Sequence, residues 1–148
     1  MMRAMLGISA ALARRSDGWS RAWMRRLARA TVRGKRIGPA ADLATLGEAW
    51  QRGFPSAKQV PITSVNGDTV MAQIRTPCPL RGSGDTTACW RMMEYDREVA
   101  RAAGGEFVVL RSQAEPGVTV CQVALRRAGA NLSDLVPAHV RSPHRVTP

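Results

Sequence analysis

The chain has few acidic residues, few lysines and few histidines. Its 148 residues contain 22 arginines and lysines against 11 aspartates and glutamates, which gives a formal net charge of +11. Only Lys35 and Lys58 are lysines, and the two histidines, His139 and His144, both come late in the sequence. No Ser-His-Asp set can therefore be built from the part of the sequence that carries the clearest folding pattern.

Other absences narrow the class of protein further. Three cysteines cannot form a complete disulfide framework, and this predicts a reduced, cytoplasmic protein. No apolar run reaches the ~18 residues that a membrane-spanning helix needs. Aromatic residues make up only 5% of the chain, and no known nucleic-acid-binding motif is present. Nucleic acid is therefore not an expected partner.

The positive charge is concentrated at the start of the sequence. Residues 1–36 hold ten basic residues and one acidic residue, whereas the remainder is nearly neutral. This predicts a basic amphipathic helical segment over 1–36, an α+β domain over 37–127 and a flexible tail over 128–148, which contains three prolines and no periodicity.

The pattern of apolar residues predicts an α+β fold. An antiparallel four-stranded sheet would form from two hairpins, with one long helix between them and the N-terminal helices packed on one face. Asn66-Gly67 marks the first hairpin turn, and Asp42 and Asp85 are predicted helix N-caps. The predicted helices span 2–15, 19–33, 43–52 and 86–103, and the predicted strands span 60–65, 69–76, 106–112 and 118–126.

The basic helix within residues 14–36 carries an aromatic stripe. Trp19, Trp23, Leu27 and Ala30 share one face at helical spacing, and arginines line another. The favoured interpretation is that the stripe packs on the sheet while the arginines face water. The alternative is that the helix binds an acidic partner protein, an anionic membrane surface or a nucleic-acid backbone.

Each cysteine lies in a different local setting. Cys78 is held between Pro77 and Pro79, an unusual position for a residue that only fills a core. Cys89 falls in the first turn of the predicted helix 86–103, where the helix dipole would favour a thiolate. Cys121 is on the inward face of a strand, where it is either a small apolar filler or part of a site.

Asp96 is predicted to face the core, on the same helical stripe as Cys89. A buried carboxylate is costly unless it is paired. It would either bond a backbone N–H, pair with Arg75 or Arg111, or act together with the cysteines. A metal site made of the three cysteines with Asp96 or water is a further alternative, although ten residues separate Cys78 from Cys89 and a zinc knuckle needs fewer.

The loop before the predicted helix 86–103 has two features that suit an anion. Gly82-Ser83-Gly84 precedes the start of the helix, and Arg81 stands beside it. Together they predict a site for the carboxylate group of a small ligand.

Between residues 60 and 127 the chain resembles the L-2-amino-thiazoline-4-carboxylic acid hydrolase-like family, a group of small bacterial proteins. The resemblance rests on Cys78-Pro79, on Cys89, on Asp96 and on a hairpin that carries Gly117 and Cys121. The activity that names the family opens a cyclic thiazoline C=N ring with water.

The resemblance implies a small cysteine-dependent hydrolase that opens the cyclic C–N bond of a thiazoline carboxylate. Cys78 or Cys89 would be the nucleophile or activator at the ring carbon, and Asp96 would orient or deprotonate water. Cys89 with Asp96 is the favoured pair. Arg81 would hold the substrate carboxylate, with Cys121 also beside the substrate.

Two other classes of function remain open from the sequence. The first is a non-catalytic module that binds or senses a small ligand or a metal in the same Cys/Asp pocket. The second is a basic adaptor that binds acidic lipid, nucleic acid or protein through its N-terminal helix. No resident cofactor is expected.

Overall fold

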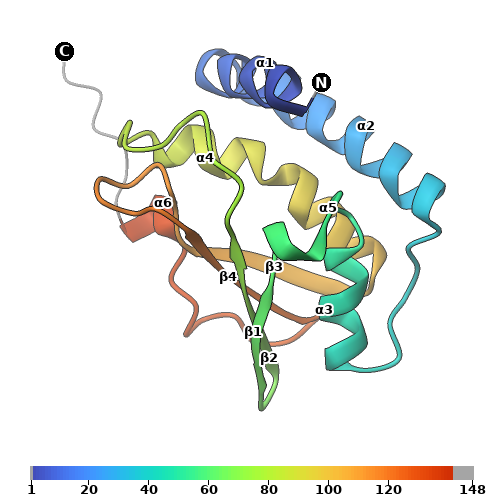
Figure 1. The fold of residues 1–148 in the computed structure, drawn as a ribbon. Coiled ribbons are helices and arrows are strands. Elements are labelled where there is room, and N and C mark those ends of the chain that lie inside the picture. The colour runs from blue at the N-terminus through green and yellow to red at the C-terminus, as the bar shows by residue number, and fades with distance from the viewer. Residues whose placement is uncertain (1, 142–148) are drawn as a thin grey trace.

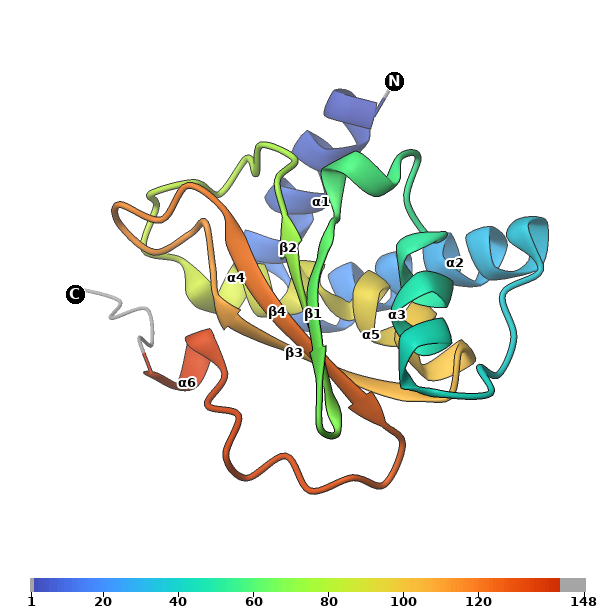
Figure 2. The ribbon, with the colours of Figure 1, turned by 60° about the horizontal axis from the view of Figure 1, so that its bottom comes forward.

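The computed structural model describes residues 2–141 and has the predicted α+β architecture. Its four strands form one antiparallel sheet in the order β1-β2-β4-β3 (Figures 1 and 2). The strands are β1 Ile62–Asn66, β2 Thr69–Ile74, β3 Gly105–Arg111 and β4 Cys121–Arg127. The main helices are α1 Met2–Arg15, α2 Asp17–Lys35, α3 Leu43–Gln51, α4 Thr86–Met92 and α5 Glu94–Ala102. A 3-10 helix η1 Ala57–Gln59 and a short helix α6 Ala138–Arg141 complete the described elements.

The first hairpin forms where the sequence predicts it. Gly67 takes a positive φ of 57° in the turn, and Asn66 pairs with Thr69 across it. Strand β1 begins at Ile62 rather than at Val60, because Pro61 has no N–H to donate to a ladder. The predicted cap residues Asp42 and Asp85 also bond the backbone N–H groups of Thr45 and Ala88.

The helix predicted over 86–103 is divided in two. Met93 separates α4 from α5 with a ψ of 5°. At this break the Trp90 carbonyl accepts a hydrogen bond from Arg97 Nη2 at 2.7 Å, so a side chain satisfies a carbonyl oxygen at the end of α4. Glu94 is buried at the start of α5.

The helices form two layers on the sheet. Helix α5 packs against β3, and α1 and α2 pack against α4 and α5 as an outer layer (Figure 1). Arg25 and Arg29 of α2 bond Glu94 and Glu98 of α5 at 2.7 and 2.9 Å, which fixes how α2 is rotated about its axis.

The prediction that the aromatic stripe of α2 packs inward is wrong. Trp19 is 80% exposed and Trp23 is 38% exposed, whereas the buried residues of α2 are Ser20, Met24 and Ala28. These smaller side chains allow α2 to approach α4 and α5 closely, and the arginine–glutamate pairs hold that orientation.

The segment predicted as a flexible tail is partly ordered. Arg126 of β4 bonds both carboxylate oxygens of Asp134, at 2.6 and 2.7 Å, and α6 packs against α4 and β3. Residues 142–148 of that predicted tail lie outside the described residues.

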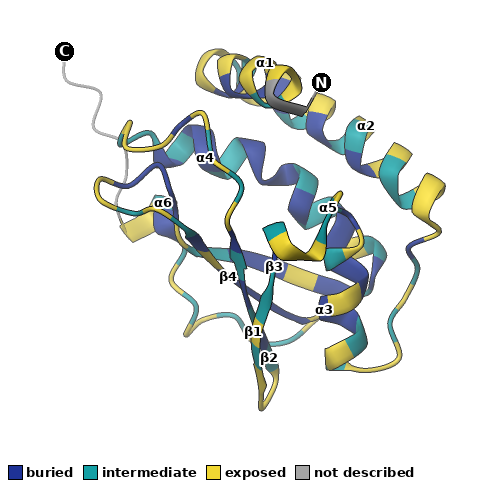
Figure 3. Cartoon of the chain, viewed as in Figure 1, coloured by how far each residue is buried: buried dark blue, intermediate teal, exposed yellow. Residues whose placement is uncertain are grey.

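The core lies between the sheet and the helices α3, α4 and α5 (Figure 3). Trp50 of α3 is fully buried and its ring lies 5.7 Å from that of Phe107 on β3. Over residues 2–141, no helix has both the length and the apolar composition that crossing a bilayer requires.

Candidate functional site

A cavity of about 460 Å³ lies between the outer helices and the rest of the protein. Helices α1 and α2 form one wall, the break between α4 and α5 forms another, and the loops around residues 53–59 and 76–79 with the end of β2 complete it. Most of its lining is apolar. The apolar side chains that line it include Met5, Leu6, Met24, Leu27, Phe54, Ile74, Met92 and Met93.

Among the described residues that line this cavity, Asp96 is the only carboxylate. It lies in the first turn of α5 and is only 5% exposed. Its Oδ1 atom is buried and has no hydrogen-bond partner within the described structure. The Trp50 indole acts on this carboxyl as a hydrogen-bonding group. It lowers the pKa of Asp96 somewhat, but Trp50 Nε1 makes no hydrogen bond of normal length and angle.

Burial controls the ionisation of Asp96. It raises the pKa of the carboxyl from 3.8 to about 7, although the Trp50 indole and the charge of Arg97 both act in the opposite direction. Neither Arg75 nor Arg111, the partners considered from the sequence, pairs with Asp96 in the described structure. The carboxyl is therefore divided between its charged and neutral forms near neutral pH.

Cys78 lines the same cavity and is half-buried. Its sulfur accepts a hydrogen bond from the backbone N–H of Leu80 at 3.4 Å. Burial raises the pKa of the Cys78 thiol, and the nearby charges of Arg81 and Arg14 offset this only in part. The resting group is a thiol that is accessible from the cavity.

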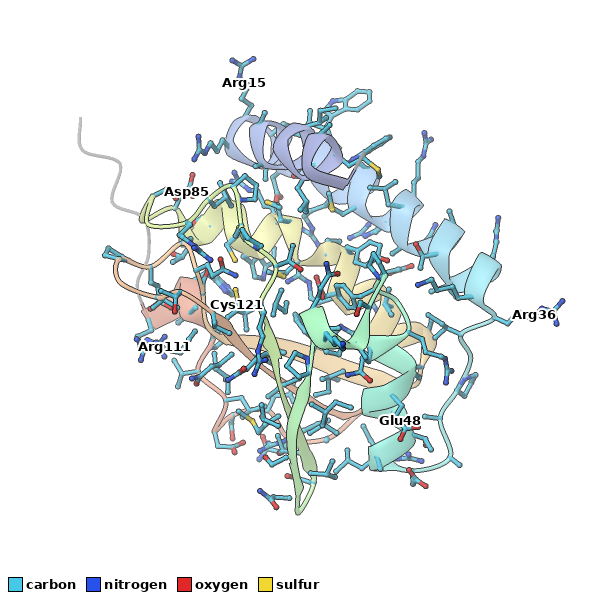
Figure 4. The ribbon with its side chains drawn as sticks, in the orientation of Figure 1. Arg15, Arg36, Glu48, Asp85, Arg111 and Cys121 are labelled. Carbon is cyan, nitrogen blue, oxygen red and sulfur yellow. The ribbon has the colours of Figure 1, made fainter. Side chains whose placement is uncertain are left out.

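Cys121 also lines the cavity, as the first residue of β4 (Figure 4). It is 1% exposed, and its sulfur accepts a hydrogen bond from the backbone N–H of Gln113 at 3.3 Å. Burial raises the pKa of this thiol to about 11. The structure therefore brings Cys78, Cys121 and Asp96 to one cavity, whereas the sequence led us to expect Cys89 in the same cavity as well.

Cys89 does not line this cavity, although it is near enough to Cys121, Cys78 and Asp96 for their charges to raise the pKa of its thiol further. It lines a second, smaller cavity of about 70 Å³ between α4, β3 and α6, and it is not among the described residues that line the larger one. Its sulfur accepts a hydrogen bond from Ser112 Oγ at 3.0 Å. Burial raises the pKa of Cys89 to about 12, so desolvation outweighs the effect of the helix start that the sequence suggested.

The Arg81 side chain is directed to protein groups. Its Nη2 donates to Gln113 Oε1 at 2.8 Å and to the Thr119 carbonyl at 3.0 Å. The N–H groups of Gly82 and Gly84 donate to the carbonyls of Gln113 and Ala114. These N–H groups therefore join the two loops, and binding of a ligand carboxylate by Arg81 stays a prediction.

Gln113 is the site residue that sequence reasoning missed. It is fully buried, and its Nε2 donates to the carbonyls of Ile74 and Thr76 at 3.2 and 2.9 Å. Its Oε1 accepts from the Cys78 N–H at 3.1 Å and from Arg81. This one amide holds the Cys78 loop against β4. Its partners belong to a segment more than 30 residues away, so no local pattern marks it.

No metal site was found in the part of the chain that the structure describes, where no three cysteine, histidine, aspartate or glutamate side chains lie close enough to hold an ion. The three cysteines and Asp96 are thus not arranged as a ligand set. No protein-family model, curated protein or solved structure matches the chain. The case for a function rests on the cavity and its polar groups.

Proposed function

We propose that this protein binds a small, mainly apolar molecule that presents a protonated nitrogen or another hydrogen-bond donor to Asp96. The observation that carries the proposal is the buried, unpartnered Oδ1 of Asp96 in the wall of an apolar cavity. A volume of about 460 Å³ falls in the range of pockets that hold small organic ligands. A donor from the ligand would satisfy an oxygen that the protein leaves unsatisfied.

The charge of the site favours an amine over an acid. A protonated amine would stabilise the ionised form of Asp96, whereas a carboxylate ligand would be repelled by it. The one lysine in the lining, Lys35, already donates to the carbonyls of Arg52 and Phe54, both at 2.7 Å. Binding of a carboxylate ligand through Arg81 stays a prediction from the sequence, and octanoate serves as its probe.

Three probes of equal chain length test the proposal: octylamine, octanol and octanoate, titrated by calorimetry near pH 8. We expect octylamine to bind most tightly and octanoate most weakly. Asp96→Asn should weaken octylamine binding more than octanol binding, since only the amine gains from the charge. Preferential binding of octanoate would overturn recognition by Asp96 and would support the carboxylate ligand instead.

A matched pair of variants locates the binding. Ala30 of α2 is exposed and lines the cavity, so Ala30→Trp should obstruct it and abolish binding of the probes. Ala22 is exposed on the same helix and is not among the lining residues, so Ala22→Trp should bind as the wild type does. Equal binding by both variants would place the probes elsewhere.

A second candidate is the hydrolase that the resemblance implies. It is favoured by the presence of Cys78 and of a carboxyl with a pKa of about 7 in the same cavity. Asp96 would take a proton from water as the water oxygen bonds to the C=N carbon. As the C–N bond breaks, this oxygen becomes the carbonyl oxygen and both hydrogens of the water end on the leaving nitrogen.

Turnover of 2-amino-thiazoline-4-carboxylate separates this candidate from simple binding. Asp96→Asn should abolish turnover, and Cys78→Ser should reduce it if the thiol is a nucleophile. Cys89→Ser should retain activity, because Cys89 does not line the cavity. A wild-type protein that binds the amine probe but converts no thiazoline would remove the hydrolase and keep the binding function.

A further inference from the structure

The outer face of α1 and α2 exposes large apolar side chains. Trp19 and Trp23 project from α2, while Met5 and Ile8 of α1 are 41% and 56% exposed. The two helices form the layer farthest from the sheet, and much of their outer surface is exposed (Figures 1 and 3). Trp19 is 80% exposed, and so large an exposed fraction is unusual for a tryptophan at the surface of soluble proteins.

Arginines without a carboxylate partner lie on the same face. Arg26 and Arg33 follow Trp19 and Trp23 at helical spacing, and both are exposed. Neither forms an ion pair within the described residues, whereas Arg25 and Arg29 pair with glutamates of α5.

Two further arginines extend the charge of the helical layer. Arg15 points away from the protein near the end of α1, and Arg36 does so just beyond the end of α2 (Figure 4). Both are exposed. Together with Arg26 and Arg33 they give the outer layer a positive surface, which complements an anionic partner.

We propose that this face, made of Met5, Ile8, Trp19, Trp23, Arg26 and Arg33, docks on an anionic lipid membrane. Indole rings favour the headgroup region, aliphatic side chains enter the boundary of the acyl chains, and guanidinium groups bind lipid phosphates. The mixture of aliphatic and basic residues distinguishes a membrane from nucleic acid, since Met5 and Ile8 would add little to a phosphate contact. Two copies of this arginine-lined face would repel each other.

Docking would also place the cavity close to lipid. Leu6 and Ser9 of α1 and Met24 and Leu27 of α2 line the cavity, so the helices that would contact the membrane are those that close the cavity. The membrane proposal does not depend on what the cavity binds.

Cosedimentation of the full chain with vesicles tests the proposal. We compare phosphatidylcholine vesicles with vesicles that contain about 30% phosphatidylserine, at about 0.1 M and about 0.5 M salt. The wild type should bind the anionic vesicles at low salt, and the emission of exposed tryptophan should shift to shorter wavelength. Salt should weaken the binding without changing the secondary structure.

Charge variants distinguish this face from overall charge. Each basic residue at an anionic surface contributes about a fivefold factor, so Arg26→Gln with Arg33→Gln should lower the partition coefficient by about 30-fold. The control Arg75→Gln with Arg111→Gln has the same net charge, and both residues are exposed and lie outside α1 and α2 in the sequence. Arg111 also lies away from these helices in space (Figure 4). It should bind within about twofold of the wild type. An equal loss in both double variants would overturn the proposal.

Tryptophan variants test the apolar contribution. Trp19→Ser with Trp23→Ser should weaken vesicle binding by at least about tenfold. Trp19→Ser alone, at a site that is already mostly exposed, serves if the double variant unfolds. Wild-type binding by these variants would refute membrane docking. Membrane docking would also be refuted if the wild type did not bind vesicles but bound single-stranded RNA. The same holds if it did not bind vesicles but formed a dimer that Trp19→Ser disrupts.

Discussion

Replacing Asp96 by asparagine should make the protein more stable at alkaline pH. The carboxyl is buried without a counterion, and its pKa is raised from 3.8 to about 7. A raised acid pKa means that the folded protein holds a proton that the unfolded chain releases, so stability falls as pH rises through this range. Asparagine has nearly the same shape and no charge to desolvate.

The magnitude follows from the two pKa values. Between about pH 5 and the folded pKa of about 7, each pH unit costs the wild type about 1.4 kcal/mol of unfolding free energy through Asp96. Above about pH 8 the loss is complete. The difference in stability between Asp96→Asn and the wild type should therefore grow by about 3 kcal/mol from pH 5 to pH 8.

Urea unfolding followed by circular dichroism at several pH values measures this difference. His139, whose pKa burial lowers, is present in both proteins, so its contribution to the pH dependence cancels. The difference should rise smoothly and level off above the folded pKa of Asp96. Parallel stability curves for the two proteins across this range would refute the claim that the buried carboxyl lacks a compensating partner.

Other perturbations test neighbouring parts of the structure. Iodoacetamide should label Cys78 first, and octylamine should protect Cys78 from labelling. Cys89 and Cys121 should react only when the protein unfolds. Mass spectrometry of tryptic peptides measures the order of labelling. At Glu94 burial alone would raise the pKa, but bonds from Arg25 and Arg97 hold it at about 2, so the wild type should lose stability as pH falls below about 4.5. Glu94→Gln should remove that acid dependence and cost about 3 kcal/mol near pH 7 in urea unfolding. Gln113→Leu should cost about 3 kcal/mol in thermal unfolding, because it leaves buried backbone groups unpaired.

Each of these has a result that would contradict it. Faster labelling of Cys89 than of Cys78 would mean that the second cavity, rather than the first, is open to reagents. An unchanged acid limb in Glu94→Gln would assign acid unfolding to other carboxylates. For Gln113, the control is Gln122→Leu at an exposed position of β4. An equal loss of thermal stability in both variants would mean that the buried hydrogen bonds of Gln113 do not contribute to stability.

The sequence predicted those features that depend on neighbouring residues. The Asn66-Gly67 turn and the N-caps at Asp42 and Asp85 are local hydrogen-bonding patterns, and all three occur. The inward orientation of Asp96 was also predicted, because the break at Met93 leaves its helical phase nearly intact.

Features set by distant contacts were not predictable in the same way. The helical period of α2 was correct, but the buried face was assigned to the most hydrophobic stripe. The orientation of α2 is fixed by ion pairs of Arg25 and Arg29 with residues 69 positions away. Gln113 belongs to the same class, since its partners lie in another loop.

Two buried carboxylates lie on α5 only two residues apart, and only one of them has arginine partners. Glu94 is paired with Arg25 and Arg97 at 2.7 and 2.8 Å, and this keeps it ionised. Asp96 has no such partner, yet Arg97 is its neighbour in sequence and is directed to Glu94. The chain therefore has arginines available to neutralise a buried acid and does not use them at Asp96. A buried carboxyl without a charged partner, in the wall of an apolar cavity, lowers stability through its desolvation. That coincidence is the physical reason to expect a ligand there.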